Sequence, residues 1–284
     1  MSRTTSRGII LMVGANIIFC AVACMVRLVS DLNAWTTTLF RFLVGIGIIG
    51  LFALSGKIKL NFVNSRGLFL RGLMGGCATA IFFYSITKLG LVRAGFIMSL
   101  YPAFAAVFGL FILKERLSPI KWGALCGGLI GALVLMGGGS TAGSVSGFDR
   151  YELLALSGAM LAGLTVVSVK KLQSTDSTVA IFFAQCLIGS MIVVVPGTIG
   201  PINLSPAVLI LLLSIGILAT VGQLLATDSY RYLTVASGSL LVMSAPVFTC
   251  VTGITLFHEP LTPAMAAGAC IILGSSASIL IEKG

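Results

Sequence analysis

Two stretches of this chain repeat one another: FILKERLSP at residues 111–119 and LFHEPLTP at residues 256–263. Each stretch ends a long apolar run and carries one acidic residue, Glu115 in the first and Glu259 in the second. These two residues fix an offset of 144 positions between the copies. An acidic turn that closes an apolar run twice in one chain indicates an internal repeat.

The repeat extends beyond the two turns. The same offset, applied without a gap, places Pro102 on Pro246, so a proline interrupts the apolar run in both copies. Residues 84–137 and 228–281 therefore follow one pattern. Internal repeats with interrupted apolar segments are typical of secondary transporters.

The composition places the chain in a membrane. Hydrophobic residues make up 57% of it and charged residues only 9%, and the mean hydropathy is +1.11. A soluble domain has about a quarter charged residues. Hydrocarbon offers no partner for a backbone amide, so only helices or closed barrels span it, and the unbroken apolar runs exclude a barrel. We expect an all-α integral membrane protein.

The apolar runs predict ten membrane-spanning helices, five in each half of the chain. They fall near residues 8–26, 34–54, 68–88, 93–113, 119–138, 152–170, 178–197, 205–228, 233–257 and 261–281. We therefore expect two repeats, residues 1–144 and residues 145–284. Because five spans per repeat is an odd number, the second repeat enters the membrane from the opposite side, which predicts an inverted-topology pair around a site near the bilayer midplane.

Basic residues predict the orientation, because Lys and Arg are retained on the cytoplasmic side. With a cytoplasmic N-terminus, thirteen of the 18 basic residues fall on that side: Arg3, Arg7, Lys57, Lys59, Arg66, Arg71, Lys114, Arg116, Lys121, Lys170, Lys171, Arg231 and Lys283. Only Arg27, Lys88, Arg93 and Arg150 fall on the other side, and Arg41 lies inside a span. We expect a bacterial-type inner membrane protein with both termini in the cytoplasm. The net charge of +10 reflects this topology and not a nucleic-acid partner.

The repeated turns carry a family resemblance. The segment 111–119, followed by the glycine-rich span 123–139, resembles the end of an EamA-type domain of the drug/metabolite transporter superfamily, and 256–263 repeats it. Phe40-Arg41-Phe42 also resembles that family's basic residue before an apolar stretch. The resemblance covers nearly the whole chain. It implies two EamA repeats and transport of small metabolites, often amino acids or amine-containing compounds, by alternating access. The chain departs from the pattern at Pro260, where the first copy has an arginine.

The paired prolines predict the substrate site. A proline inside a helix removes one amide, so Pro102 frees the carbonyl of Met98, and Pro246 frees that of Val242. Interrupted helices at matching repeat positions point to a transport site. The neighbouring candidates are Ser99, Tyr101, Met243 and Ser244. The alternative is that both kinks serve only helix packing.

Other polar residues inside the spans add candidates, because an amide or hydroxyl in hydrocarbon needs a protein or water partner. Asn16 is the first choice as a hydrogen-bonding group of the cavity, with an interhelical clasp as the alternative. Tyr84 and Gln223 are further substrate-binding candidates. An aromatic cage for a cation, built from Tyr84, Tyr101, Tyr230 and Phe104, is a separate possibility.

Two charged residues are expected to serve structure or gating. Arg41 lies well inside a span, where it is an anion anchor, a gate, or a side chain that snorkels to the interface or is capped by carbonyls. Because the family resemblance includes a basic residue here, a structural or gating role is favoured over substrate binding. Its partner at the repeat offset is Gln185. Asp228 is the carboxylate nearest to a span interior and serves proton coupling or pairs with Arg231, three residues along the helix.

The remaining motifs exclude other functions. No HExxH or GxSxG motif occurs, so an enzyme is not expected. All seven cysteines lie in predicted spans, and we expect neither a metal site nor a cofactor. Gly123, Gly127 and Gly131 predict close packing of one helix within the protomer or across a homodimer. The predicted function is an exporter or exchanger of a small amino-acid-like or amine metabolite, with a lipid-linked carrier flippase or a non-transporting membrane subunit as alternatives.

Overall fold

The computed structural model describes residues 3–58, 60–115, 118–137, 149–199, 205–245, 247–248, 251–252, 255 and 262–281. Every regular element in these residues is a helix, and helices occur at all ten predicted spans. They are α1 (Arg3–Leu28), α2 (Ala34–Leu54), α3 (Ser65–Leu89), α4 (Leu91–Met98), α5 (Tyr101–Ile112), α6 (Pro119–Gly137), α7 (Arg150–Leu172), α8 (Thr178–Thr198), α9 (Pro206–Ser229), α10 (Val235–Val242) and α12 (Pro263–Ile281). By length and composition, α1, α2, α3, α7, α8 and α9 are each able to cross a membrane. The chain is a multi-pass membrane protein.

Polar residues at the connections start the helices. Asn33 accepts a hydrogen bond from the amide of Trp35 at α2, and Ser177 accepts one from Ala180 at α8. At α7, Asp149 and Glu152 form a capping box. The first amides of a helix have no partner within it, so these side chains satisfy groups that the membrane cannot.

The fourth span is broken where the sequence predicts. Helix α4 ends at Met98, and α5 begins at Tyr101 with Pro102 in its first turn. In the second copy α10 ends at Val242, and Pro246 lies outside the described residues. Proline lacks the amide that would continue the hydrogen-bond pattern of the preceding turn, which explains the break at Pro102.

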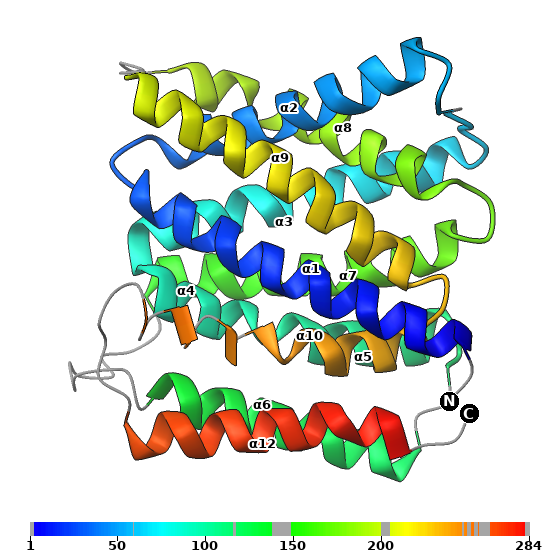
Figure 1. Cartoon of the computed structure of the whole chain (residues 1–284), viewed down its shortest axis with the longest axis vertical. Coiled ribbons are helices and arrows are strands. Elements are labelled where there is room, and N and C mark those ends of the chain that lie inside the picture. Colours follow the sequence, from blue (N-terminus) through cyan, green and yellow to red (C-terminus); the bar gives the residue numbers. More distant parts are fainter. Residues whose placement is uncertain are drawn as a thin grey trace.

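The helices form one bundle, in which α6 and α12 run alongside each other whereas α2 and α9 cross (Figure 1). Helix α2 packs on α8, α3 packs on α7 and α8, and α1 packs on α9. Helix α6 packs on α12, and this pair forms the lowest layer of Figure 1. The first turn of α1 and the last turn of α12 lie at the same end of the bundle.

Glycines bring α6 and α12 together. A side chain added at Gly127 would lie 2.8 Å from the hydroxyl of Ser275, and one at Gly131 would lie 3.0 Å from Ile271. The predicted packing face is therefore confirmed within the protomer for these two glycines. At Gly123 an added side chain would meet no atom within 4 Å in the described part of the chain, so no such contact is made there.

Hydrogen bonds from side chains link four interhelical connections at one end of the bundle. Asp176, after α7, accepts hydrogen bonds from the amides of Val63 (2.8 Å) and Asn64 (3.3 Å), which precede α3. Lys170, near the end of α7, donates to the carbonyls of Tyr230 and Leu233, each at 2.8 Å. The carboxylate of Glu115, after α5, accepts from the amide of Val235 at 3.1 Å. The ends of α2, α5, α7 and α9 therefore lie together.

Candidate functional site

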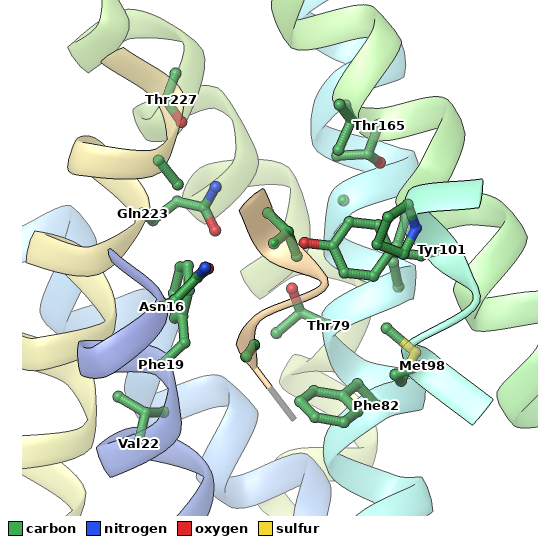
Figure 2. Close-up of a pocket in the computed structure, with 18 of the residues that line it drawn as sticks. Asn16, Phe19, Val22, Thr79, Phe82, Met98, Tyr101, Thr165, Gln223 and Thr227 are labelled. Carbon is green, nitrogen blue, oxygen red and sulfur yellow. The ribbon is translucent and has the colours of Figure 1, made fainter. Parts of the chain in front are cut away.

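A cavity of about 270 Å³ lies inside the bundle, between helices of both halves (Figure 2). Helices α1 to α5 supply one set of lining residues, and α7 to α10 supply the other. The described residues of α6 and α12 do not contribute to it. The cavity is therefore lined by helices of both halves, and the pair α6 and α12 stands outside it in the described residues.

The structure brings most of the predicted site residues together. Those that line the cavity are Asn16, Arg41, Met98, Ser99, Tyr101, Pro102, Gln223 and Met243. Tyr84, Ser244 and Asp228 do not line it, and Pro246 lies outside the described residues. In Figure 2 the Tyr101 hydroxyl points across the cavity toward the side that carries Asn16 and Gln223.

Asn16 lines the cavity and also links two helices. Its side-chain nitrogen donates to the carbonyl of Leu241 at 2.9 Å and to the hydroxyl of Ser244 at 3.2 Å, which ties α1 to the end of α10. The same side chain is 2% exposed and lines the cavity. Ser244 lies behind it and donates its own proton to Leu241 at 2.6 Å, so Ser244 supports Asn16 and does not line the cavity itself.

The predicted aromatic cage is not assembled. Tyr101 and Tyr230 line the cavity, but Tyr84 lies in a row of rings between Trp35 (5.7 Å between centroids) and Tyr151 (6.2 Å). Phe104 stacks on its neighbour one helical turn away and does not line the cavity. The rings of Tyr84 and Phe104 do not face the cavity because of the way their helices are rotated about their axes.

Asp228 belongs to the end of α9 and not to the cavity. Its carboxylate forms an ion pair with Arg231 at 3.2 Å and accepts a hydrogen bond from the Thr178 hydroxyl at 3.1 Å. The predicted alternative, pairing with Arg231 along one helix face, is therefore confirmed.

Arg41 lies in the cavity wall and does not snorkel. Its side chain is 6% exposed, its terminal nitrogen lies 3.5 Å from the amide oxygen of Gln223, and its guanidinium lies 5.4 Å from the ring centre of Phe83. A guanidinium over an aromatic face gains electrostatic attraction without a counter-charge.

Arg71 is the cavity residue that the sequence-based prediction misplaced. It was counted with the basic residues of the cytoplasmic side, near the start of the predicted span 68–88, but α3 begins at Ser65, and Arg71 lies within it and is 1% exposed. Its terminal nitrogen donates to the amide oxygen of Gln185 at 2.9 Å, and both residues line the cavity. Arg41 is therefore not the only charge inside the described spans. One signal was present in the sequence: Gly75 lies one turn after Arg71.

Gly75 makes room for this arginine. A side chain added there would overlap the second terminal nitrogen of Arg71, and it would also lie 3.2 Å from the amide carbon of Gln185. The amide nitrogen of Gln185 donates to the carbonyl of Gly75 (3.2 Å) and to the hydroxyl of Thr79 (3.3 Å). Arg71 and Gln185 are thus held in one fixed arrangement between α3 and α8.

Several buried polar atoms of the cavity wall have no hydrogen-bond partner among the described residues. They are Nε of Arg41, Nε and Nη1 of Arg71, the hydroxyls of Thr165 and Thr227, and the hydroxyl of Tyr230. Buried polar groups are almost always hydrogen-bonded, so a cluster of exceptions needs an explanation. All of these atoms belong to residues that line the cavity.

Comparison with known proteins agrees with this architecture. The chain is 24% identical over 287 residues to the pseudopaline exporter CntI of Pseudomonas aeruginosa, covering 98% of this chain and 97% of that protein. It is 25% identical over 242 residues to solute carrier family 35 member G1 of Homo sapiens, covering 79% of this chain and 66% of that protein. It also matches a crystal structure with a TM-score of 0.75 at 18% identity, over 95% of both chains, which shows the fold.

The model of the EamA-like transporter family matches the chain twice, at residues 6–137 and at residues 149–281. The two matches together cover most of the chain. Members of this family are transporters and not enzymes. The chain therefore belongs to the EamA-like transporter family.

Proposed function

We propose that the protein is an alternating-access exporter or exchanger of a small amino-acid-like or amine-containing metabolite. The observation that carries this proposal is the cavity between the two halves, whose wall holds buried polar atoms without a partner in the described chain. Its volume of about 270 Å³ lies just below the usual range of small-molecule sites, which enclose about 300–1,000 Å³. A small solute suits this volume better than a lipid-linked chain does.

The pairing of helices supports an inverted repeat of residues 1–144 and residues 145–284. At the offset of 144 positions, α2 corresponds to α8 and α6 to α12, and each of these helices packs on its own counterpart. Under the same correspondence α1 matches α7 and α3 matches α9. The contact of α1 with α9 therefore matches the contact of α7 with α3. A two-fold relation between the halves has this consequence, and alternating access follows when one half rocks against the other around the cavity.

The distribution of charge supports cytoplasmic termini in an inner membrane. The end of the bundle that gathers the connections after α2, α5, α7 and α9 carries the basic residues Lys57, Lys114, Lys170, Lys171 and Arg231. With Arg71 moved into the cavity wall, twelve basic residues remain on the proposed cytoplasmic side, against four on the other. This imbalance is what the positive-inside rule requires.

The relatives support export of a small metabolite. One relative that matches along nearly its whole length is a pseudopaline exporter, and the human relative is a solute carrier. A cavity without a carboxylate among its described lining residues also gives no sign of a proton-coupling acid, which favours exchange or facilitated export.

Uptake and counterflow in proteoliposomes test the proposal. The purified protein is reconstituted and screened with labelled amino acids and amines, and empty vesicles serve as the control. We expect saturable counterflow of at least one solute. Silence across the panel together with translocation of a lipid-linked sugar would establish the flippase alternative, and silence in both assays would identify a non-transporting subunit.

A further inference from the structure

Two cationic side chains face the cavity at the interface between the halves. Arg41 comes from α2 and Arg71 from α3, and at 6% and 1% exposure neither head group reaches bulk water. A guanidinium keeps its proton at neutral pH. Burying such a charge is costly unless an anion or several hydrogen bonds compensate it, and the cost is greatest inside a membrane protein.

The described protein groups compensate these charges only partly. The acceptors are neutral: the amide oxygen of Gln185 for Arg71, and that of Gln223 for Arg41. The ring of Phe83 lies under the Arg41 guanidinium. Nε of both arginines and Nη1 of Arg71 have no acceptor in the described part of the chain.

No described carboxylate is available to these arginines. None lines the cavity, and five of the six described acidic residues have other positions and partners. Glu115 accepts from the amide of Val235, Asp149 and Glu152 cap α7, Asp176 accepts from the connection before α3, and Asp228 pairs with Arg231. The sixth, Asp31, is an exposed residue after the end of α1.

A third feature adds positive potential. The first turn of α5, with Tyr101 and Pro102, lines the same cavity, and the N-terminal end of a helix carries a partial positive charge. Hydroxyl groups of Thr165 and Thr227 lie in the wall as further hydrogen-bonding groups. In Figure 2 Gln223, Thr227 and Thr165 lie toward one end of the cavity, whereas Val22, Phe82 and Met98 lie toward the other. These labelled polar side chains thus lie toward one end of the cavity and these apolar ones toward the other.

We propose that Arg41 and Arg71 bind carboxylate groups of the transported solute, so that the substrate is a net-anionic, carboxylate-bearing metabolite and not an amine. A planar carboxylate matches the donors that a guanidinium presents, and such bonds are among the strongest in proteins. This inference rests on the proposed function. Of the amino-acid-like and amine-containing metabolites named there, it selects those that carry a carboxylate. It also assigns to Arg41 a role in binding, where the sequence favoured a structural or gating role.

Binding to the purified protein provides the first test. Thermal unfolding is followed with L-glutamate and glutarate as the acids, with cadaverine and L-leucine as the amine and the neutral amino acid, and with inorganic phosphate. A ligand that binds only the folded protein raises the midpoint of unfolding. We expect a concentration-dependent rise with the dicarboxylates and none with cadaverine. A rise with cadaverine alone, or with phosphate alone, overturns the proposal.

Variants that replace either arginine with a neutral residue test whether that arginine binds the carboxylate. Arg41→Gln and Arg71→Gln are each expected to weaken dicarboxylate binding about 10- to 100-fold, which corresponds to one charge-assisted hydrogen bond. Both are expected to fold, because removal of a poorly compensated buried charge is commonly neutral or stabilising. Arg150→Gln, which removes a basic residue outside the cavity, is the matched control and is expected to bind as the parent protein does. Unchanged binding in both cavity variants contradicts the inference.

A gain-of-charge variant separates binding from a structural role. Gln185→Glu places a carboxylate beside Arg71, at the position of an oxygen that is now 2.9 Å from it. If Arg71 binds the solute, this internal anion competes with it, so the variant unfolds at a higher temperature without ligand and binds dicarboxylates at least about tenfold more weakly. Higher stability with undiminished dicarboxylate binding would show that Arg71 is only structural.

Transport assays distinguish failure of the proposed transporter function from failure of the proposed carboxylate site. Counterflow of amines but not of acids leaves the transporter function intact and refutes the carboxylate substrate. Dicarboxylate binding that depends on Arg41 and Arg71, in vesicles that transport no solute, refutes the transporter function and leaves the binding site intact.

Discussion

At the residue scale, Gly75 shows how a missing side chain places a charge. The Arg71 guanidinium lies where a side chain of Gly75 would be, and Gln185 holds both the arginine and the carbonyl of Gly75. Glycine inside a helix usually costs about 1 kcal/mol relative to alanine. At this position the absence of a side chain leaves space for a buried guanidinium.

Gly75→Ala is therefore expected to abolish or strongly reduce solute counterflow, because the added methyl group displaces Arg71 from Gln185. Gly47→Ala in α2 is the matched control, since its methyl group would meet no atom within 4 Å in the described chain, and we expect normal transport. Counterflow in proteoliposomes, with the amount of folded protein checked by size-exclusion chromatography, measures both. Parental transport by the Gly75 variant would refute the positioning of Arg71 by this glycine.

Asn16→Ala is expected to weaken substrate binding, because it removes an amide from the cavity wall, and to lower the unfolding temperature, because it releases the end of α10. Ser244→Ala removes part of the same clasp but no cavity-lining group, so we expect it to lower stability and leave binding nearly unchanged. Ligand titrations followed by thermal unfolding compare the two variants. Equal loss of binding in both would show that Asn16 acts only as a clasp.

At the element scale, Lys170 and Glu115 hold the connection between α9 and α10. Lys170 donates to two carbonyls before α10, and the Glu115 carboxylate accepts from Val235 at its first turn. Orphan groups at two helix termini are satisfied by side chains from α7 and from the end of α5. These bonds join elements of both halves at the basic end of the bundle.

Lys170→Met is expected to make the cavity more accessible from the basic end, because the two carbonyls lose their donor. A thiol placed at Ser99 in a cysteine-free background reports this change as faster labelling by a membrane-impermeant reagent from that side. Lys171→Met is the control, since Lys171 is exposed at the adjacent position and is not part of these bonds. Equal labelling rates in the two variants would argue against a closing role for Lys170.

At the scale of the whole molecule, the contact between Asp176 and the residues before α3 places the ends of α2 and α7 on the same side. Cysteines that replace Lys57, Lys170 or Lys171 are therefore expected to be labelled from the cytoplasmic side. Cysteines that replace Lys88 and Arg150 are expected to be labelled from the opposite side. Labelling of intact cells and inverted vesicles measures this, and opposite sides for positions 57 and 171 would exclude the inverted repeat.

The sequence alone determined where the helices lie. Eight of the ten predicted spans coincide with one helix to within five positions, because a backbone in hydrocarbon must satisfy its own amides and a run of about 20 apolar residues is the local solution. The span 93–113 is divided into α4 and α5, and α10 covers only the first part of the span 233–257. The proline at residue 102 likewise determined where the fourth span breaks. A shift of three residues at the start of α3, from a predicted 68 to Ser65, was one step in misplacing Arg71.

Only the tertiary structure decided which side chains share the cavity. The rotation of a helix about its axis depends on the neighbours it packs against, and weak amphipathic patterns in apolar helices do not reveal it. For this reason Tyr84 turned away and Arg71 and Gln185 met across 114 positions of sequence. Local chemistry fixed the spans of this protein, and packing between its halves fixed the electropositive site.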